Sequence, residues 1–291
     1  MTAIKLGLIG DNIALSRAPA LHRLAGGIAG LQVSYDLLIP AERNLDFDAL
    51  FAWAAGAGYR GLNITLPYKE RVVPKVLIED PLARSIAAIN TVVFDPAGGR
   101  PSGYNTDHSG FIQAFRGQMG AQSPGVVVQI GAGGVGKAIA FGLIALGATA
   151  IRLVEIDRDK AERLAAALRL AAPGLPVTVS GDAAAAALGA TGILNCTPLG
   201  MGGYGGTPLP AASLEAAAKA GAQWAFDAVY TPRDTAFLRA AAAAGLAAIS
   251  GYELFFFQGV DAFRRFTGRA VDEARLRAAL YHIDSVQIIQ S

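Results

Sequence analysis

A glycine-rich turn between an apolar run and a helical stretch constrains this chain more than any other feature. The apolar run Val126–Ile130 predicts a strand of a sheet that is covered on both faces, and a helix is predicted over Val135–Leu146. Residues 131–136 between them read Gly-Ala-Gly-Gly-Val-Gly. A GxGxxG pattern between a strand and a helix is typical of dinucleotide-binding βα units. The sequence therefore predicts a Rossmann domain.

The glycine-rich turn also predicts which groups hold the dinucleotide. Gly131 allows a tight turn, Gly133 lets the backbone approach a pyrophosphate, and Gly136 permits close packing of helix and strand. The free N–H groups at the start of the helix, including those of Gly134 and Val135, are expected to bind the phosphates. A later loop, after the predicted strand Gly192–Cys196, could cover the cofactor through Thr197 and Pro198.

The choice between NAD and NADP is expected to depend on the end of the next predicted strand, Ile151–Ile156. An acidic residue about 20 positions after the glycines binds the adenine ribose in NAD enzymes and would repel the 2′-phosphate of NADP. Glu155 and Asp157 both lie in range, and Asp157 could instead cap the following helix. We therefore predict NAD, with Glu155 as the first candidate for the ribose. NADP stays the alternative because the guanidinium of Arg158 could accommodate a phosphate.

Composition excludes several classes of function. The 291 residues carry a net charge of +2 with scattered basic residues, which argues against a nucleic-acid partner. Apolar runs are broken about every ten residues, so no membrane span is expected, and the N-terminal segment reads as a buried strand rather than a signal peptide. The single cysteine and three histidines offer no metal-binding spacing. We expect a cytoplasmic protein with no metal, no membrane association and a small-molecule partner.

Alternating strand-like and helical stretches predict an α/β fold with two domains. Residues 1–107 are expected to form an α/β substrate-binding and catalytic domain with a mainly parallel sheet. Residues 108–250 are expected to form the Rossmann dinucleotide-binding domain, and residues 251–291 to form helices that pack back on the first domain. The alanine runs at 183–187 and 240–244 fit packed helices, because alanine is the strongest helix former.

Polar residues gather at the ends of three predicted strands of the first domain. Alternation along a strand aims Asn63 and Thr65 the same way, and Lys69 follows shortly after them. The pair Asn90-Thr91 and the stretch 103–107 supply two more polar strand ends in an otherwise apolar domain. Such convergence is typical of a site for a hydroxylated ligand.

Eight ordered motifs now place the chain in a known group. The motifs GLIGDNIALSRAPALH, GLNITLPYKE, AINTVVF, GYNTDHSGF, GAGGVG, NCTPLGM, FDAVYTP and GYELFFFQ span nearly the whole chain. In order and spacing, the chain resembles the shikimate dehydrogenase family, which oxidises a ring hydroxyl of shikimate or quinate.

The resemblance implies roles for individual residues. Lys69 matches the catalytic lysine of the family and Asp107 its aspartate partner. A lysine acts as a base only if burial or a nearby positive charge lowers its pKa, whereas a neighbouring carboxylate raises it. We expect the two side chains to meet opposite the nicotinamide. The other residues implied around the substrate are Ser16, Asn63, Thr65, Asn90, Tyr230 and Gln258.

Two departures from the family pattern bear on the substrate. Where the family has a second hydroxyl for the substrate carboxylate, this chain has Ala18, and Arg17 could replace it or point to solvent. His108 stands where shikimate-specific members have Gly, and bulky residues there are typical of quinate-using members. Two alternatives follow: a divergent dehydrogenase of an amino-substituted or otherwise substituted cyclohexene acid, and a non-catalytic nucleotide-binding regulator. A monomer or homodimer is expected.

Overall fold

The computed structural model describes residues 3–289, which pack as two units. Unit 1 contains the residues up to Thr106 together with those from Gln258 onward, and unit 2 contains Asp107–Phe257. The second boundary falls within helix α10 (Gly251–Thr267). The chain is a mixed α/β protein, as the sequence predicts.

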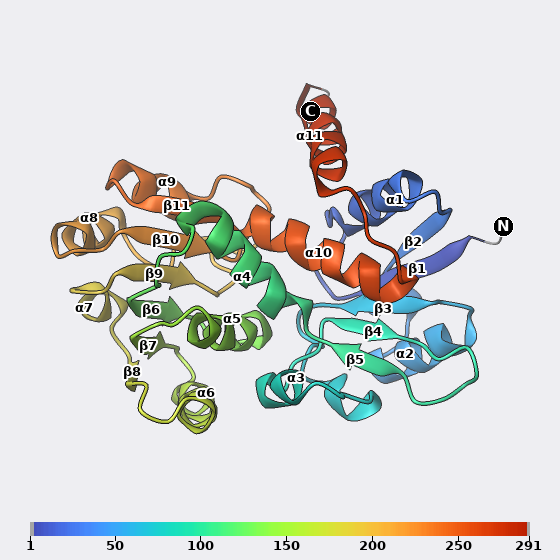
Figure 1. Cartoon of the computed structure of the whole chain (residues 1–291), viewed down its shortest axis with the longest axis horizontal. Coiled ribbons are helices and arrows are strands. Elements are labelled where there is room, and N and C mark those ends of the chain that lie inside the picture. Colours follow the sequence, from blue (N-terminus) through green and yellow to red (C-terminus); the bar gives the residue numbers. More distant parts are fainter. Residues whose placement is uncertain (1–2, 290–291) are drawn as a thin grey trace. The chain divides into compact units, whose positions relative to one another are not determined.

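Unit 1 is built on a five-stranded sheet in the order β2-β1-β3-β4-β5 (Figure 1). The strands are β1 (Ile4–Ile9), β2 (Val33–Leu38), β3 (Gly61–Ile64), β4 (Thr91–Val93) and β5 (Ser102–Tyr104). The first three run parallel, but β4 is antiparallel to β3 and β5 is antiparallel to β4. The expectation of a mainly parallel sheet is therefore wrong for β4 and β5. The short connection 94–101 can only reverse the chain, because a parallel crossover needs a dozen or more residues.

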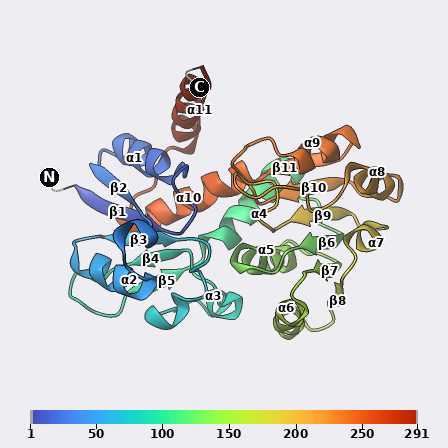
Figure 2. The same cartoon turned by 180° about the vertical axis from the view of Figure 1, so that it is seen from behind.

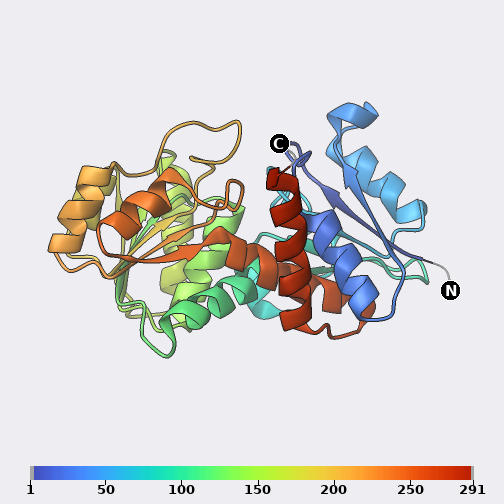
Figure 3. The same cartoon turned by 90° about the horizontal axis from the view of Figure 1, so that it is seen from above.

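Helices cover both faces of this sheet. The sheet is covered by α1 (Ala18–Ile28), α2 (Phe47–Gly56), α3 (Pro81–Ile86) and the second part of α10, with the 3₁₀ turns η1 (Ala41–Arg43) and η2 (Val73–Lys75). The last helix of the unit is α11 (Glu273–Ile289). Helix α2 begins where the Asp46 carboxylate accepts a hydrogen bond from the Ala49 N–H at 2.8 Å, and it buries Leu50 against Leu62 and Ile64. Helix α1 lies on the other face, as seen from behind in Figure 2, and α11 packs along it (Figure 3).

Unit 2 is built on a parallel six-stranded sheet in the order β11-β10-β9-β6-β7-β8. The strands are β6 (Val126–Ile130), β7 (Ala150–Val154), β8 (Val177–Ser180), β9 (Gly192–Asn195), β10 (Trp224–Asp227) and β11 (Ala247–Ser250). This is the strand order of the Rossmann fold, with a topological switch between β6 and β9. The predicted Rossmann architecture is confirmed.

The helices of unit 2 lie on both faces of its sheet (Figure 1). They are α4 (Thr106–Met119), α5 (Gly134–Ala145), α6 (Arg158–Ala171), α7 (Ala183–Ala187), α8 (Ala211–Lys219), α9 (Ala236–Ala243) and the first part of α10. On one face, Phe111 of α4 meets Phe226 edge-to-face at 5.1 Å. The opposite face packs on α7, α8 and α9, so both alanine runs are helical as predicted. Sequence analysis did not anticipate α1, α3 or α8.

Candidate active site

The polar residues predicted in unit 1 gather at one edge of its sheet. Thr65 follows the end of β3, and its N–H donates to the carbonyl of Ile9, the last residue of β1, at 2.9 Å. Gly10 lies so close to this turn that an added Cβ would stand 2.3 Å from Cγ2 of Thr65. The loop that carries Ser16 therefore begins against Thr65, and only a glycine at position 10 permits that approach.

The antiparallel direction of β4 brings Asn90 to the same edge. Asn90 precedes the first residue of β4, and its carbonyl accepts from the N–H of Ile64 at 2.9 Å. Had β4 been parallel to β3, its start would lie at the opposite edge. Strand β5 reverses again and ends beside Thr91, so the segment that leads into Asp107 starts from this edge as well.

Asn90 holds the residue that precedes Asp107. Its side-chain oxygen accepts from the N–H of Thr106 at 2.8 Å, and its side-chain nitrogen donates to the Thr106 hydroxyl oxygen at 3.0 Å. Asn90 and Thr106 are buried. The start of α4 is thereby fixed to the sheet edge by paired polar groups, which are stronger in a low-dielectric interior than in water.

Asn63 lies beneath this edge rather than at its surface. Its Nδ2 donates to the Asn90 carbonyl and to the Thr91 hydroxyl, each at 3.2 Å, while its Oδ1 accepts from the Tyr35 hydroxyl at 2.8 Å. Asn63 is only 7% exposed. Both N–H groups of the amide are thus used within the protein.

His22 completes this buried network. Its ring stacks on Tyr35 with centroids 4.8 Å apart and an interplanar angle of 9°. Burial lowers the pKa of His22 to about 3, against the partial opposition of a side-chain hydrogen bond with Asn63. Nδ1 of His22 makes no hydrogen bond within the described residues. The neutral imidazole of His22 therefore contacts Asn63, which in turn donates a hydrogen bond to Asn90. Sequence analysis missed His22 and Tyr35, although the polar His22 in the apolar face of a helix was a usable signal.

Ser16 and Lys69 both lie half-buried in unit 1. The Ser16 hydroxyl oxygen accepts from the Ala18 N–H at 3.3 Å, at the start of α1. The carbonyl of Lys69 accepts from the N–H of Ile89 at 2.8 Å, which ties the lysine backbone to the residue before Asn90. Asp107 is 5% exposed in the first turn of α4. Thr65, Lys69 and Asn90 of unit 1 are therefore brought to one sheet edge, whereas Asp107 is the first residue of unit 2.

The glycine-rich turn of unit 2 has the backbone that its sequence implies. Gly131 has a φ of +103°, and an added Cβ would lie 2.7 Å from the carbonyl oxygen of Cys196. At Gly136 an added Cβ would lie 2.5 Å from the carbonyl oxygen of Gly131. At Gly133, in contrast, the space is open except for Nζ of Lys160 at 3.8 Å. The first and third glycines are needed for packing, whereas the second leaves room for a ligand.

This turn fits a pyrophosphate. Helix α5 begins at Gly134 without a side-chain hydrogen bond at its N-cap, Gly133. Uncapped N–H groups at the start of a helix favour an anion. The open space above Gly133 and the nearby ammonium group of Lys160, which sequence analysis missed, suit the same ligand.

The side chain of Gln129 holds the glycine-rich turn in place. Sequence analysis did not identify this residue. It is fully buried in β6, and its Nε2 donates to the carbonyl oxygens of Gly131 and Gly136 at 2.9 and 3.0 Å. One side chain thus links both ends of the glycine motif. The sequence signal is Gln129 itself, a side-chain amide within the predicted apolar strand Val126–Ile130.

The two acidic residues after β7 contact each other, because the Asp157 N–H donates to Oε1 of Glu155 at 3.3 Å. Oε2 of Glu155 accepts from the Ala132 N–H at 2.8 Å, so this carboxylate adjoins the glycine-rich turn. Asp157 is the N-cap of α6 and accepts from the Lys160 N–H at 3.0 Å. A carboxylate has about four acceptor positions, so Glu155 keeps capacity for ribose hydroxyls.

The loop after β9 is held by a second buried network. Asn195 accepts from the Thr197 hydroxyl at 2.7 Å and donates to Asp227 at 2.9 Å, and Thr235 donates to the other oxygen of Asp227 at 2.6 Å. Burial raises the pKa of Asp227 despite these bonds. Thr197 and Pro198 are half-buried in this loop. Sequence analysis named Thr197 and Pro198 but missed the three residues that support them.

The remaining predicted residues lie near α10. The ring of Tyr230, just after β10, stacks on Phe255 at 4.8 Å with an interplanar angle of 10°. Gln258 is half-buried on α10. Among residues 3–289, no three His, Cys, Asp or Glu side chains gather where they could hold a metal ion. No helix in the same range is long and apolar enough to cross a bilayer.

Comparisons with known proteins all identify shikimate and quinate dehydrogenases as relatives, some named for NAD and others for NADP. Residues 8–92 match the family model described as shikimate dehydrogenase substrate binding domain. The chain is 37% identical over 284 residues to a quinate/shikimate dehydrogenase (NAD(+)) of Corynebacterium efficiens, covering 95% of this chain and 97% of the relative. It is 39% identical over 278 residues to a shikimate dehydrogenase (NADP(+)) of Streptomyces avermitilis, covering 94% and 93%. Its fold is similar to that of quinate dehydrogenase from Corynebacterium glutamicum in complex with NAD, with a TM-score of 0.84, 35% identity and coverage of 96% and 99%.

Proposed function

We propose, on the ground that this chain belongs to the shikimate dehydrogenase family, that it is an NAD-preferring enzyme acting on quinate or shikimate. The enzyme is an oxidoreductase of the shikimate and quinate dehydrogenase type. One observation carries the finer proposal: Glu155 places a carboxylate against the glycine-rich turn. A carboxylate there accepts from ribose hydroxyls and repels a 2′-phosphate. The NAD-bound Corynebacterium glutamicum structure supports the same choice.

The dinucleotide would be held by residues of unit 2. Gly131, Gly133, Gly134, Val135 and Gly136 would bind the pyrophosphate, and Glu155 with Asp157 would face the adenine ribose, with Thr197 and Pro198 covering the cofactor. When bound, the dinucleotide would supply a hydride acceptor for the ring carbon that carries the reacting hydroxyl. The chain's own residues then supply orientation and proton transfer.

Lys69 and Asp107 would handle the proton in this proposal. The amine of Lys69 would take the proton of the reacting hydroxyl, and a carbonyl would form on the same ring carbon. Asp107 orients the amine. The hydrogen bonds of Asn90 to Thr106 support this assignment, because they fix the residue that precedes Asp107.

The substrate would be bound at the sheet edge of unit 1. Ser16 is proposed for its carboxylate, and Thr65 and Asn90 for its ring hydroxyls, with Tyr230 and Gln258 as further ligands. Asn63, whose amide is already bonded, would act chiefly by holding Asn90 in place. Because Ala18 supplies no second hydroxyl, a related cyclohexene acid with another substituent is the alternative substrate. A small cyclic hydroxy acid as partner, a monomer or homodimer, and a cytoplasmic location stay predictions.

The proposal is tested by initial rates with four combinations of substrate and cofactor. Quinate and shikimate are each assayed with NAD and with NADP, and kcat/KM is compared. We expect kcat/KM to be at least tenfold higher with NAD than with NADP for the better substrate. Equal or higher values with NADP would refute the assignment of Glu155. Binding of NAD without turnover of either acid would favour the non-catalytic regulator.

A further inference from the structure

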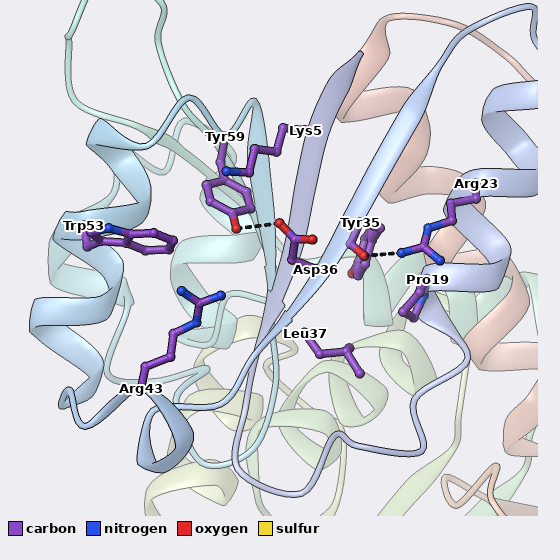
Figure 4. A pocket seen from close by; sticks show the side chains of 9 residues that line it. All are labelled: Lys5, Pro19, Arg23, Tyr35, Asp36, Leu37, Arg43, Trp53 and Tyr59. Atoms are coloured by element: carbon purple, nitrogen blue, oxygen red, sulfur yellow. Dashed lines mark hydrogen bonds between the residues drawn. The ribbon is translucent and has the colours of Figure 1, made fainter.

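A second depression lies away from the predicted active site, along the outer edge of β2 in unit 1 (Figure 4). We call it the β2-edge pocket, and its principal lining residues are Lys5, Arg23, Asp36, Arg43, Trp53 and Tyr59. It is a shallow depression, widely open to solvent, with a volume of about 580 Å³. Lys5 is at the start of β1 and Tyr59 precedes β3, whereas Ser16, Thr65 and Lys69 follow the ends of these strands. The two sites are therefore distinct.

The β2-edge pocket carries an excess of positive charge. Lys5, Arg23 and Arg43 line it, and Asp36 is the one carboxylate among its lining residues. Arg23 donates to the Tyr35 carbonyl at 2.8 Å and Lys5 to the Ala57 carbonyl at 3.3 Å. The guanidinium of Arg43 makes no hydrogen bond or ion pair with any described residue, so its N–H groups remain available to a ligand. A guanidinium binds a carboxylate or a phosphate through two hydrogen bonds, so the pocket favours an anionic ligand group.

Aromatic rings give this pocket flat walls. The guanidinium carbon of Arg43 lies 4.7 Å from the centre of the Trp53 ring, and Nζ of Lys5 lies 4.2 Å from the centre of the Tyr59 ring. Trp53 is 41% exposed, which leaves indole surface for a ligand. A planar ring packs well against such a surface.

Asp36 adds a specific acceptor. The Tyr59 hydroxyl donates to its Oδ2 at 2.7 Å and fixes the carboxylate (Figure 4). Oδ1 has no donor among the described residues. A ligand hydroxyl or amino group could therefore donate to it. Inorganic phosphate would use the cations only, and it would be repelled by Asp36.

We propose that the β2-edge pocket binds a small aromatic carboxylate that carries a hydroxyl or amino group. Its carboxylate lies on Arg43 and Lys5, its ring lies beside Trp53, and its donor faces Asp36. This proposal does not depend on the activity of the enzyme, because binding is measured without turnover.

Tryptophan fluorescence of the full chain tests the proposal directly. The chain has two tryptophans, and Trp224 is fully buried in unit 2, so Trp53 reports on the pocket. Titration with 4-hydroxybenzoate is expected to change the emission saturably. 4-Hydroxybenzamide, which has no negative charge, and inorganic phosphate, which has no ring, should each bind at least tenfold more weakly. Absence of a saturable change, or equal affinity for either comparison ligand, would overturn the proposal.

Variants distinguish ligand binding at this pocket from ligand binding at other sites. Arg43→Ala should weaken 4-hydroxybenzoate at least tenfold, because a charge-assisted pair of hydrogen bonds is lost. Arg163→Ala removes an exposed arginine on α6 and should leave the affinity unchanged, as should Lys69→Ala. Lys5→Met removes a different positive charge from the pocket and should also weaken binding. It serves as the second test because Arg43 is part of η1. Trp53→Phe should abolish the emission change. An unchanged affinity in both Arg43→Ala and Lys5→Met, or a signal that survives Trp53→Phe, would contradict the assignment.

Discussion

The hydroxyl of Tyr35 donates a hydrogen bond to Oδ1 of Asn63 at 2.8 Å, between two side chains that are 1% and 7% exposed. This bond links the edge strand β2 to the central strand β3. Because Asn63 also donates to the Asn90 carbonyl, Tyr35 helps to position a residue of the proposed substrate site.

Removing the hydroxyl in Tyr35→Phe should therefore destabilise the enzyme and impair substrate binding. A buried acceptor that loses its donor costs about 1–3 kcal/mol, measured as the free energy of unfolding in urea. We expect kcat/KM for the better substrate to fall as well, mainly through KM. Tyr204→Phe, at a residue that is 37% exposed, is the control. Equal stability of the two variants would show that the bond contributes nothing.

His22 should make the folded state sensitive to acid. Its pKa is lowered from 6.5 to about 3 in the folded protein, so the unfolded chain binds a proton more readily between those values. Stability therefore falls as the pH falls through this window, by about 2–3 kcal/mol between pH 7 and pH 4.5. His22→Phe removes this contribution and should flatten the pH dependence of the unfolding free energy. His282→Gln, at an exposed position, should not.

Gln129→Leu tests the amide that links both ends of the glycine-rich turn. Without the two bonds from Nε2, the carbonyls of Gly131 and Gly136 lose a buried donor, and the turn is expected to loosen. The dissociation constant for NAD should rise about tenfold, corresponding to about 1.4 kcal/mol, as measured by calorimetry. Gln223→Leu, at an exposed residue, serves as the matched control. Tight NAD binding by Gln129→Leu would mean that the turn holds its shape unaided.

Glu155→Ala tests the choice of cofactor. The carboxylate that adjoins Ala132 is removed, so ribose hydroxyls lose an acceptor and a 2′-phosphate loses a source of repulsion. We expect the dissociation constant for NAD to rise tenfold to a hundredfold, which corresponds to about 1.4–2.7 kcal/mol, and the ratio of NADP to NAD affinity to increase. Glu162→Ala, on the exposed side of α6, should change neither value. A variant that keeps the original preference would exclude Glu155 as its determinant.

Lys69→Ala should lower kcat by about 10²–10⁴ with a modest change in KM, the range for a lost general base. Lys219→Ala, at an exposed residue of α8, should retain full activity. NAD affinity of both variants is measured to show that the cofactor site is intact. Nearly unchanged turnover in Lys69→Ala would remove this lysine from the mechanism.

The local pattern of apolar residues and glycines was sufficient to predict the Rossmann unit. It was not sufficient to predict the direction of strands β4 and β5 in unit 1. Val126–Ile130 and the following glycines carry the strand, turn and helix in contiguous residues. Thr91–Val93, in contrast, is a three-residue strand whose direction depends on its partners. Its side chains alternate between the two faces of the sheet in the same way whether the strand runs parallel or antiparallel to β3.

Sequence analysis also did not identify the buried polar side chains that support the predicted site residues. Gln129, Asp227 and Tyr35 act through residues distant in sequence or through backbone carbonyls, and each lies in a strand that an apolar pattern describes well. The residues that they support, such as Gly131, Thr197 and Asn63, were predicted because motifs carry them. Hydrogen-bond partners that are supplied by the tertiary fold leave no spacing rule in the sequence.

The hairpin of β4 and β5 also determines where this protein can be altered. Its tip, residues 95–100, is exposed and lies at the end of the sheet opposite to Asn90 and Thr106. Exposed loop tips tolerate inserted peptides better than other positions do. An affinity tag or a fluorescent label at this tip would be kept away from the reacting end of the sheet by the length of the two strands.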